Sequence, residues 1–276
     1  YTQQYGKQQG KYYVPQRDSA GLDPWVTPQA YDNAKEFFDT GITWSNSLNV
    51  AQMLEKSSYS ISLGNTHQDG IISSTGMDRY NVKVSADTKL TNNWSSGFTA
   101  NYITTSIDKA VTSGNGLLRT VYAAPPSYDL AGIPSHVDGN QYTQNSFRGS
   151  FDNAYWAMDN NKFTEDTNRF FGNVYASYQT DFGTTNHKLN AKYMVGVDAY
   201  TTHYVDSYGY GSNTGGGRGQ IENYGWTNAT YNSLLTINYD WHINEDWGLN
   251  AVLGNEIIQS NRKKYYEYGT NYNLSL

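Results

Sequence analysis

The sequence contains no cysteine, and charged residues make up only 16% of its 276 positions. The lack of cysteine excludes a disulfide scaffold, a thiolate zinc site and a cysteine nucleophile. No run of about 18 apolar residues occurs, which excludes a membrane-spanning helix. The formal net charge of -6 leaves no basic surface for phosphate groups, so we expect no nucleic-acid partner.

Tyrosine, by contrast, is abundant, with 26 residues, and neutral side chains supply most of the polarity. Apolar and polar residues alternate with a period of two in a series of segments, which is the pattern of β-strands with two unlike faces. The segments cover residues 42–50, 59–64, 80–87, 94–102, 169–179, 189–198, 231–242 and 247–256. The sequence therefore predicts an all-β protein with about eight antiparallel strands.

One face of these strands is apolar, and the other carries mainly Asn, Ser, Thr and Gly. Such a polar face does not suit a dry core, but it suits a water-filled lumen or a plug. We therefore expect the apolar face to contact the lipid of an outer membrane, through Trp44, Val82, Val84, Val195, Ile237 and Leu249. A closed barrel of about eight strands has room only for side chains inside, so a solvated lining predicts an arc of a larger transmembrane barrel.

The connections between the segments sort into two groups. Those after the first, third, fifth and seventh segments are short, whereas the connections at 69–78, 106–166 and 204–226 are longer. With antiparallel strands, all short turns then lie at one end of the sheet and all long loops at the other, as in outer-membrane barrels. We predict long extracellular loops at 106–166 and 204–226, an extracellular segment at 1–41 that leads into the barrel, and barrel strands over 42–276.

Two other protein classes stay open as alternatives. A soluble antiparallel sandwich has the same alternation, so the period by itself does not exclude a secreted β-sandwich or solenoid that binds carbohydrate. A passive porin is the other alternative. The sorting of the connections favours the membrane barrel, because a sandwich has no physical reason to collect its long loops at one end.

Several short motifs add a resemblance to a known family. In order along the chain they are residues 35–41 (KEFFDTG), 58–64 (SYSISLG), 69–73 (DGIIS), 78–82 (DRYNV), 90–94 (LTNNW) and 124–130 (APPSYDL). In this order they resemble SusC-like TonB-dependent transporters. The resemblance implies an outer-membrane barrel of about twenty-two strands, with a plug domain that these residues do not include. It also implies energised import of glycans or peptides, with TonB acting through the plug and a SusD-like surface lipoprotein as partner.

The long loop at 106–166 is rich in aromatic residues. Rings on an outer loop can stack on sugar faces or pack against a partner lipoprotein. The candidates for ligand binding are Tyr122, Tyr128, Tyr155 and Trp156. The alternative is that these rings pack the loop onto itself.

No motif points to catalysis, to a metal or to a cofactor. The five histidines are scattered without HExxH spacing, and the GxSxG nucleophile motif is absent. The glycine-rich stretch at 209–219 lacks the Lys-Ser/Thr ending of a phosphate loop and is better explained as a flexible outer loop. The acidic stretch at 159–166 lacks EF-hand spacing and is better explained as a surface turn. We therefore predict a transporter and not an enzyme.

Overall fold

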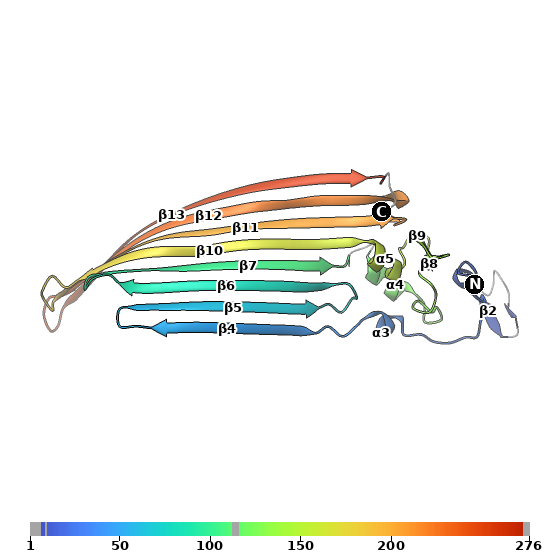
Figure 1. Cartoon of the computed structure of the whole chain (residues 1–276), viewed down its shortest axis with the longest axis horizontal. Coiled ribbons are helices and arrows are strands. Elements are labelled where there is room, and N and C mark those ends of the chain that lie inside the picture. Colours follow the sequence, from blue (N-terminus) through green and yellow to red (C-terminus); the bar gives the residue numbers. More distant parts are fainter. Residues whose placement is uncertain (1–6, 9, 112–115, 273–276) are drawn as a thin grey trace.

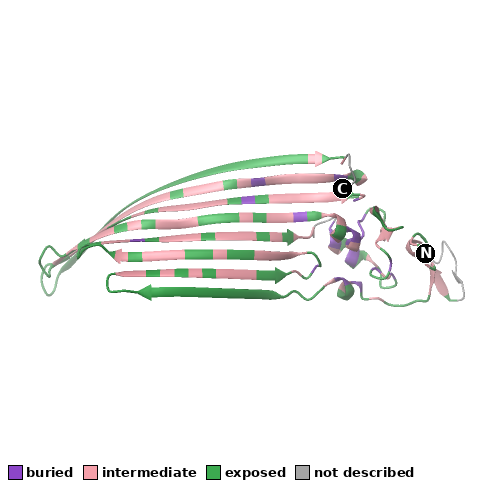
Figure 2. Ribbon diagram, in the orientation of Figure 1, coloured by how far each residue is buried: buried purple, intermediate pink, exposed green. Residues whose placement is uncertain are grey.

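The computed structural model of the chain describes residues 7–8, 10–111 and 116–272. Its main feature is one antiparallel sheet in the order β13-β12-β11-β10-β7-β6-β5-β4 (Figure 1). The strands are β4 (Thr43–Met53), β5 (Ser57–Asp69), β6 (Gly76–Lys89), β7 (Trp94–Lys109), β10 (Lys162–Thr180), β11 (His187–Tyr210), β12 (Arg218–His242) and β13 (Gly248–Thr270). Each predicted segment lies in one of these strands, apart from Ile42 and Trp247, which come one residue before β4 and β13. This confirms the predicted all-β class. Among the described residues the sheet is not closed, and its edge strands β4 and β13 are exposed along almost their whole length (Figure 2).

The strands extend further toward the long connections than predicted. β11 runs to Tyr210 and β12 begins at Arg218, so most of the predicted loop at 204–226 is strand, and only 211–217 connect the two. This turn contains the 3-10 helix η1 (Thr214–Gly217), in which Gly215 and Gly216 have positive φ values. Glycine adopts such values without steric cost. The glycine-rich stretch therefore reverses the chain tightly and is not a long loop.

Short turns occupy the opposite end of the sheet. They join β4 to β5, β6 to β7, β10 to β11 and β12 to β13. In two of them a side chain holds the reversal: Thr91 Oγ1 accepts from the Trp94 N–H at 3.0 Å, and Asn244 Oδ1 accepts from the Trp247 N–H at 2.9 Å. Such side-chain turns stabilise tight reversals. At the cap end only the connection at 110–161 is long, whereas those at 70–75 and 211–217 have six and seven residues, close to the six of 181–186 at the opposite end. The predicted sorting of the connections by length therefore holds only for 110–161.

The buried core of the chain lies outside the sheet, in a cap beside the long connections (Figure 2). We define the cap as the described residues of 7–41 and 110–161. Its elements are β1 (Lys7–Gln8), β2 (Lys11–Tyr13), α2 (Pro15–Asp18), β3 (Trp25–Val26), α3 (Asn33–Phe37), α4 (Leu117–Ala123), β8 (His136–Val137), β9 (Asn140–Gln144) and α5 (Ala154–Asn160). The predicted loop at 106–166 is therefore shorter than expected, and much of it is structured.

Two segments far apart in the sequence share the core of the cap. Phe37 from the first segment is 3% exposed, and Trp156 from the second is 0% exposed. The Leu130 N–H donates to Asn33 Oδ1 at 3.1 Å, and the Trp156 indole N–H donates to the carbonyl of Gln141 at 2.8 Å. The buried Asn33 side chain and the Trp156 indole thus have hydrogen-bond partners within the cap.

Candidate functional site

The register of the sheet assigns each strand residue to one of two faces. Residues directly opposite on paired strands point to the same side, so a row of side chains can be followed across the sheet. One such row is Leu48, Leu63, Val82, Tyr102, Phe170, Ala199, Ala229 and Asn261. All the residues predicted to contact lipid lie on the same side as this row: Trp44, Val82, Val84, Val195, Ile237 and Leu249. We call this side the apolar face and the other side the polar face.

The apolar face is uncovered within the described part of the chain. Leu48 is 58% exposed, Val174 54% and Leu253 66%, although all three are aliphatic. The other described sheets, β1-β2-β3 and β8-β9, are small and belong to the cap, so neither packs on this face. A sandwich requires a second sheet over the apolar face, and the described residues provide none. An exposed apolar surface of this extent marks a site of contact with a membrane or another protein.

The apolar surface ends before the strands do. Toward the cap, in strands β5, β6, β7 and β10, it stops before a row that contains His67, Asp78, Ser106 and Asp166. His67 Nδ1 lies 2.8 Å from Asp78 Oδ1, and the Ser106 hydroxyl donates to Asp166 at 2.6 Å. Trp44 lies in the same row, at the edge of the sheet. The apolar residues therefore form a band with a polar border, which we call the apolar band.

The apolar band crosses the strands obliquely. It is centred near Leu48 in β4 and near Leu253 in β13, whereas the β13 residue in the row of Leu48 is Asn261, eight residues away. Eight residues are roughly 27 Å along a strand, and the seven spacings between eight strands are roughly 34 Å across the sheet. The strands are therefore tilted by about 40° from the normal of the band. Strands of membrane barrels are tilted by about 35–45°.

The height of the band agrees with this geometry. In β10 the band extends from Phe170 to Tyr178, and in β12 from Tyr231 to Trp241. These spans are roughly 27 and 34 Å along the strands, or roughly 21 to 26 Å along the normal once the tilt is included. The apolar belt of outer-membrane barrels is about 25 Å tall and is bordered by aromatic rings. Tyr178, at the border near the short turns, packs against Trp94 with ring centroids 5.0 Å apart.

The polar face pairs its charges across the strands. Arg169 Nε and Nη2 donate to the two carboxylate oxygens of Asp198 at 2.8 and 2.6 Å. The Tyr175 hydroxyl donates to Asp87 at 2.6 Å, and Lys192 Nζ lies 4.1 Å from the centroid of the Tyr175 ring. Charged side chains at the height of a lipid belt require water or protein beside them. The polar face is thus suited to line an aqueous lumen.

Two of the predicted ligand-binding residues are buried in the cap. Trp156 is 0% exposed, and Tyr128 is 4% exposed with its ring centroid 4.9 Å from that of Phe147. Neither ring offers a free face to a sugar or a peptide. The structure therefore does not support ligand contact for these two residues and gives them a packing role, because the cap needs large rings to fill its core.

The other two predicted ligand-binding residues lie nearer the surface of the cap. Tyr122 in α4 is 67% exposed, and its ring centroid is 6.2 Å from that of Phe38. Tyr155 in α5 is half-buried against Phe37, with ring centroids 5.3 Å apart. Burial raises the pKa of the Tyr155 hydroxyl, and the charge of Glu36 raises it further. Tyr122 is thus the predicted residue that is most accessible to a ligand or a partner.

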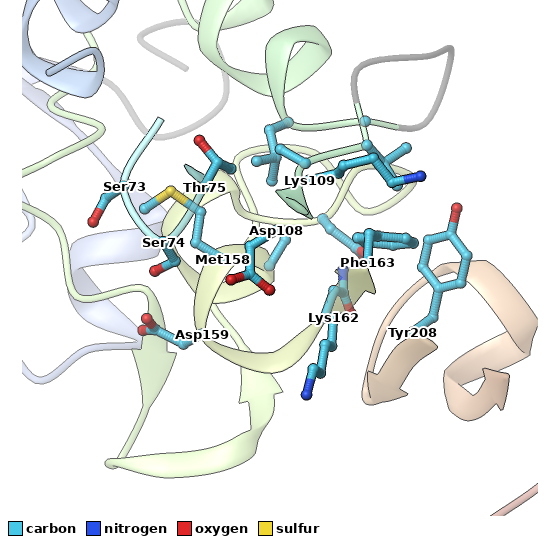
Figure 3. A pocket seen from close by; sticks show the side chains of 17 residues that line it. Ser73, Ser74, Thr75, Asp108, Lys109, Met158, Asp159, Lys162, Phe163 and Tyr208 are labelled. Carbon is cyan, nitrogen blue, oxygen red and sulfur yellow. The ribbon is translucent and has the colours of Figure 1, made fainter. Parts of the chain in front are cut away.

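A cavity of about 270 Å³ lies between the cap and the ends of the strands (Figure 3). Its lining combines charged side chains, such as Asp108, Lys109 and Lys162, with the apolar Met158 and Phe163. Ligand pockets commonly combine apolar walls with a few polar groups. The cavity is small, and part of its lining belongs to the segment next to residues 112–115.

The acidic stretch at 159–166 is not the surface turn that we expected. Asp159 lies in the last turn of α5, and the residues from Lys162 onward belong to β10. No group of three or more His, Cys, Asp or Glu side chains is placed to hold a metal ion in the described ranges. No helix among the described residues is long and apolar enough to cross a membrane.

A cluster of aromatic rings that the sequence analysis missed lies on the polar face near the cap. Tyr204, Tyr224 and Tyr266 form one row across β11, β12 and β13, and we call them the tyrosine row. The rings of Tyr204 and Tyr224 are stacked, with centroids 4.9 Å apart and planes 8° apart, and Trp226 lies 5.3 Å from Tyr204. The sequence carries a strand signal here, because Tyr204, Asp206 and Tyr208 stand at every second position and so share one face of a strand. The nearby glycines led to a loop prediction instead.

Comparisons with known proteins bear on the fold. No family model and no curated protein matches the chain. Among solved structures, a chain of the RagAB peptide importer in its closed-closed state matches with a TM-score of 0.70 and 16% identity, over 89% of this chain and 27% of that chain. The open-open state matches with a TM-score of 0.69 and 15% identity, over 88% and 27%. The chain thus spans just over a quarter of the length of these relatives. At this identity the likeness shows the fold alone: an eight-stranded antiparallel sheet similar to part of a β-barrel transporter.

Proposed function

We propose that this chain forms part of the wall of an outer-membrane barrel that imports nutrients into a Gram-negative bacterium. The observation that carries the proposal is the apolar band, which is uncovered, bounded by polar residues and oblique to the strands. In water, such a band would forgo about 25 cal/mol for each Å² of apolar surface left unburied. Lipid removes this penalty, and the tilt and height of the band agree with a barrel in a bilayer.

We further propose that import is active and of the SusC-like, TonB-dependent kind. The order of the short motifs along the chain supports this proposal, and so does the likeness to a peptide importer. In this proposal the polar face surrounds a plug domain, and TonB acts through that plug. The cap lies outside the cell, where a SusD-like lipoprotein binds near the exposed Tyr122 and delivers glycans or peptides. The proposed function involves no catalysis and no cofactor.

Uptake by cells that carry the complete transporter tests both proposals. We expect deletion of its gene to abolish growth on a limiting glycan or peptide mixture, and a protonophore to stop uptake immediately because import is energised. Uptake that continues unchanged with the protonophore would instead indicate a passive porin. Recovery of the folded protein in the soluble fraction without detergent would exclude the barrel and favour a secreted binding protein.

A further inference from the structure

The polar face near the cap arranges acidic, aromatic and basic side chains in a fixed order. Asp206 and Glu222 lie opposite each other in one row of this face, and the tyrosine row is the next row away from the cap. Two residues further along β13 comes Lys264, in the row of Trp226. An acidic end and a basic end are therefore separated by aromatic rings.

This part of the polar face lies outside the proposed lipid belt. Tyr224 is twelve residues from Thr236, which lies on the polar face at the height of the centre of the apolar band in β12. Twelve residues correspond to roughly 40 Å along the strand and roughly 30 Å along the normal. Half of an outer-membrane belt is only about 12 Å. The tyrosine row therefore lies on the wet wall of the mouth, on the side of the cap.

The stacked rings stabilise the sheet, whereas the two carboxylates beside them do not. Cross-strand aromatic pairs stabilise a sheet, which accounts for the contact of Tyr204 with Tyr224. Asp206, however, lies directly opposite Glu222, and like charges in that position destabilise a sheet. Neither carboxylate takes part in an ion pair within the described chain, whereas Glu165 in the next strand is paired with Lys109 at 3.3 Å. Asp206 accepts from the Tyr224 hydroxyl at 3.1 Å and Glu222 from the Gln220 amide at 3.2 Å, so both carboxylates have neutral donors but lack a cation among the described residues.

The neighbouring rings already hold cations on their faces. Lys109 Nζ lies 4.5 Å from the centroid of Tyr204, and the Arg262 guanidinium carbon lies 5.0 Å from the centroid of Trp226. Ring faces attract ammonium and guanidinium groups through the ring quadrupole. Tyr266 is 61% exposed, so its ring remains accessible beside Glu222. A ligand with a cationic group has both an aromatic and an acidic partner here.

The spacing of the two charged ends sets the size of the ligand. Tyr268, the β13 partner of Glu222, is four residues from Lys264 and six from Arg262. These separations are roughly 13 and 20 Å along a strand. An extended peptide spans about 3.3–3.6 Å per residue, so a chain of about four to six residues places its charged ends at this distance.

We infer that this surface binds the free ends of a zwitterionic oligopeptide of about four to six residues. Its ammonium end lies between Asp206 and Glu222, its side chains contact the tyrosine row, and its carboxylate lies at Lys264. We call these six residues the peptide surface: Tyr204, Asp206, Glu222, Tyr224, Lys264 and Tyr266. The inference rests on the proposed function, in which the polar face of the sheet contacts water. It deepens that function by naming how a substrate is recognised.

Binding of blocked and free peptides to the complete transporter in detergent tests the inference. The probe is a pentapeptide with a fluorophore on its middle side chain, prepared free, N-acetylated or C-amidated, and its Kd is measured by fluorescence anisotropy. We expect acetylation and amidation each to weaken binding about tenfold, because each removes a charge that has an opposite partner. Asp206→Asn combined with Glu222→Gln should abolish the effect of acetylation and keep the effect of amidation. Lys264→Gln should do the reverse.

Matched controls keep the result interpretable. Asp181→Asn and Lys188→Gln change the same residue types near the short turns, and they should leave all affinities unchanged. A heat-dependent shift of each variant in gel electrophoresis confirms that it is folded. Equal affinity for free and acetylated peptide, equal losses in the control variants, or displacement of the probe by maltopentaose would overturn the inference. Failure of the proposed function has a different signature, namely uptake that resists a protonophore while peptide binding is unchanged.

Discussion

Two arginine substitutions on the apolar face of β13 should differ sharply in cost, although both side chains point to the same side of the sheet. Leu253 lies at the centre of the apolar band, whereas Gln259 lies six residues closer to the cap. Six residues are roughly 20 Å along the strand and roughly 16 Å along the normal, which is beyond the edge of a belt with a half-height of about 12 Å. Gln259 nevertheless shares its row with Val50 of β4, which lies inside the band.

The magnitudes follow from depth in the membrane. Arginine on the lipid face costs about 2–4 kcal/mol at the middle of the bilayer and about 0–1 kcal/mol near its interfaces. Leu253→Arg and Val50→Arg should therefore lower the folding equilibrium by roughly 30- to 700-fold, since about 1.4 kcal/mol is a factor of ten. Gln259→Arg should lower it by less than about fivefold.

Folding of the complete protein into phosphatidylcholine vesicles across a urea series measures these differences, with the heat-dependent gel shift as the readout. The comparison of Val50 with Gln259 is the sharpest, because the two residues share a row of the sheet. Equal costs at Val50 and Gln259 would mean that the lipid boundary follows the hydrogen-bonded rows. The tilt of about 40° derived from the register would then be wrong.

Three further predictions concern other parts of the chain. Val82→Arg should cost about 2–4 kcal/mol, whereas the neighbouring Asn81→Arg on the polar face should be tolerated, and equal assembly yields would refute the assignment of faces. Trp156→Ala should cost about 3–5 kcal/mol and expose the cap to limited proteolysis while the barrel keeps its gel shift; an unchanged cleavage pattern would contradict the role of this ring in the core. Asp152 accepts hydrogen bonds from Ser212, Asn213 and Gln144, so Asp152→Asn should cost about 1–3 kcal/mol and speed hydrogen exchange at the Asn213 amide.

The strands of the sheet could be predicted from the sequence because each one carries its own alternation of apolar and polar residues. The predicted lipid-facing residues, including Val82, Val195 and Ile237, share one face in the observed register. Alternation fixes the face of each strand independently of its neighbours, so errors in one strand do not spread to the next. The oblique course of the band could not be predicted, because it depends on the register between strands.

The cap could not be predicted because its fold depends on contacts between residues that are far apart in the sequence. Helices α4 and α5 are seven residues each, too short for a helical period to stand out. Their stability comes from burial against a segment about 80 to 120 residues earlier, such as the contact of Tyr155 with Phe37. The buried state of Trp156 follows from the same long-range packing. An aromatic loop residue therefore looks identical in sequence whether it binds a ligand or fills a core.

The tyrosine row and the carboxylates beside it could not be predicted for a different reason. Glycines around 209–219 favoured a loop, whereas the alternation of Glu222, Tyr224 and Trp226 extends the strand pattern to within a few residues of the turn. The positive φ values of these glycines occur in the turn and at Gly219, the second residue of β12. Strand alternation next to a glycine-rich stretch thus indicates the strand bounds better than the glycine content does.

Spin labels on two adjacent residues of β10 test the central claim most directly. This chain has no native cysteine, so Val174→Cys and Asn173→Cys each provide one attachment site within it. In the complete protein in a bilayer, we predict that the label at 174 is accessible to oxygen and shielded from a water-soluble nickel chelate, and that the label at 173 is not accessible from lipid. A label at 174 that is reached by the chelate, or that is shielded from both reagents, would contradict contact between the apolar face and lipid.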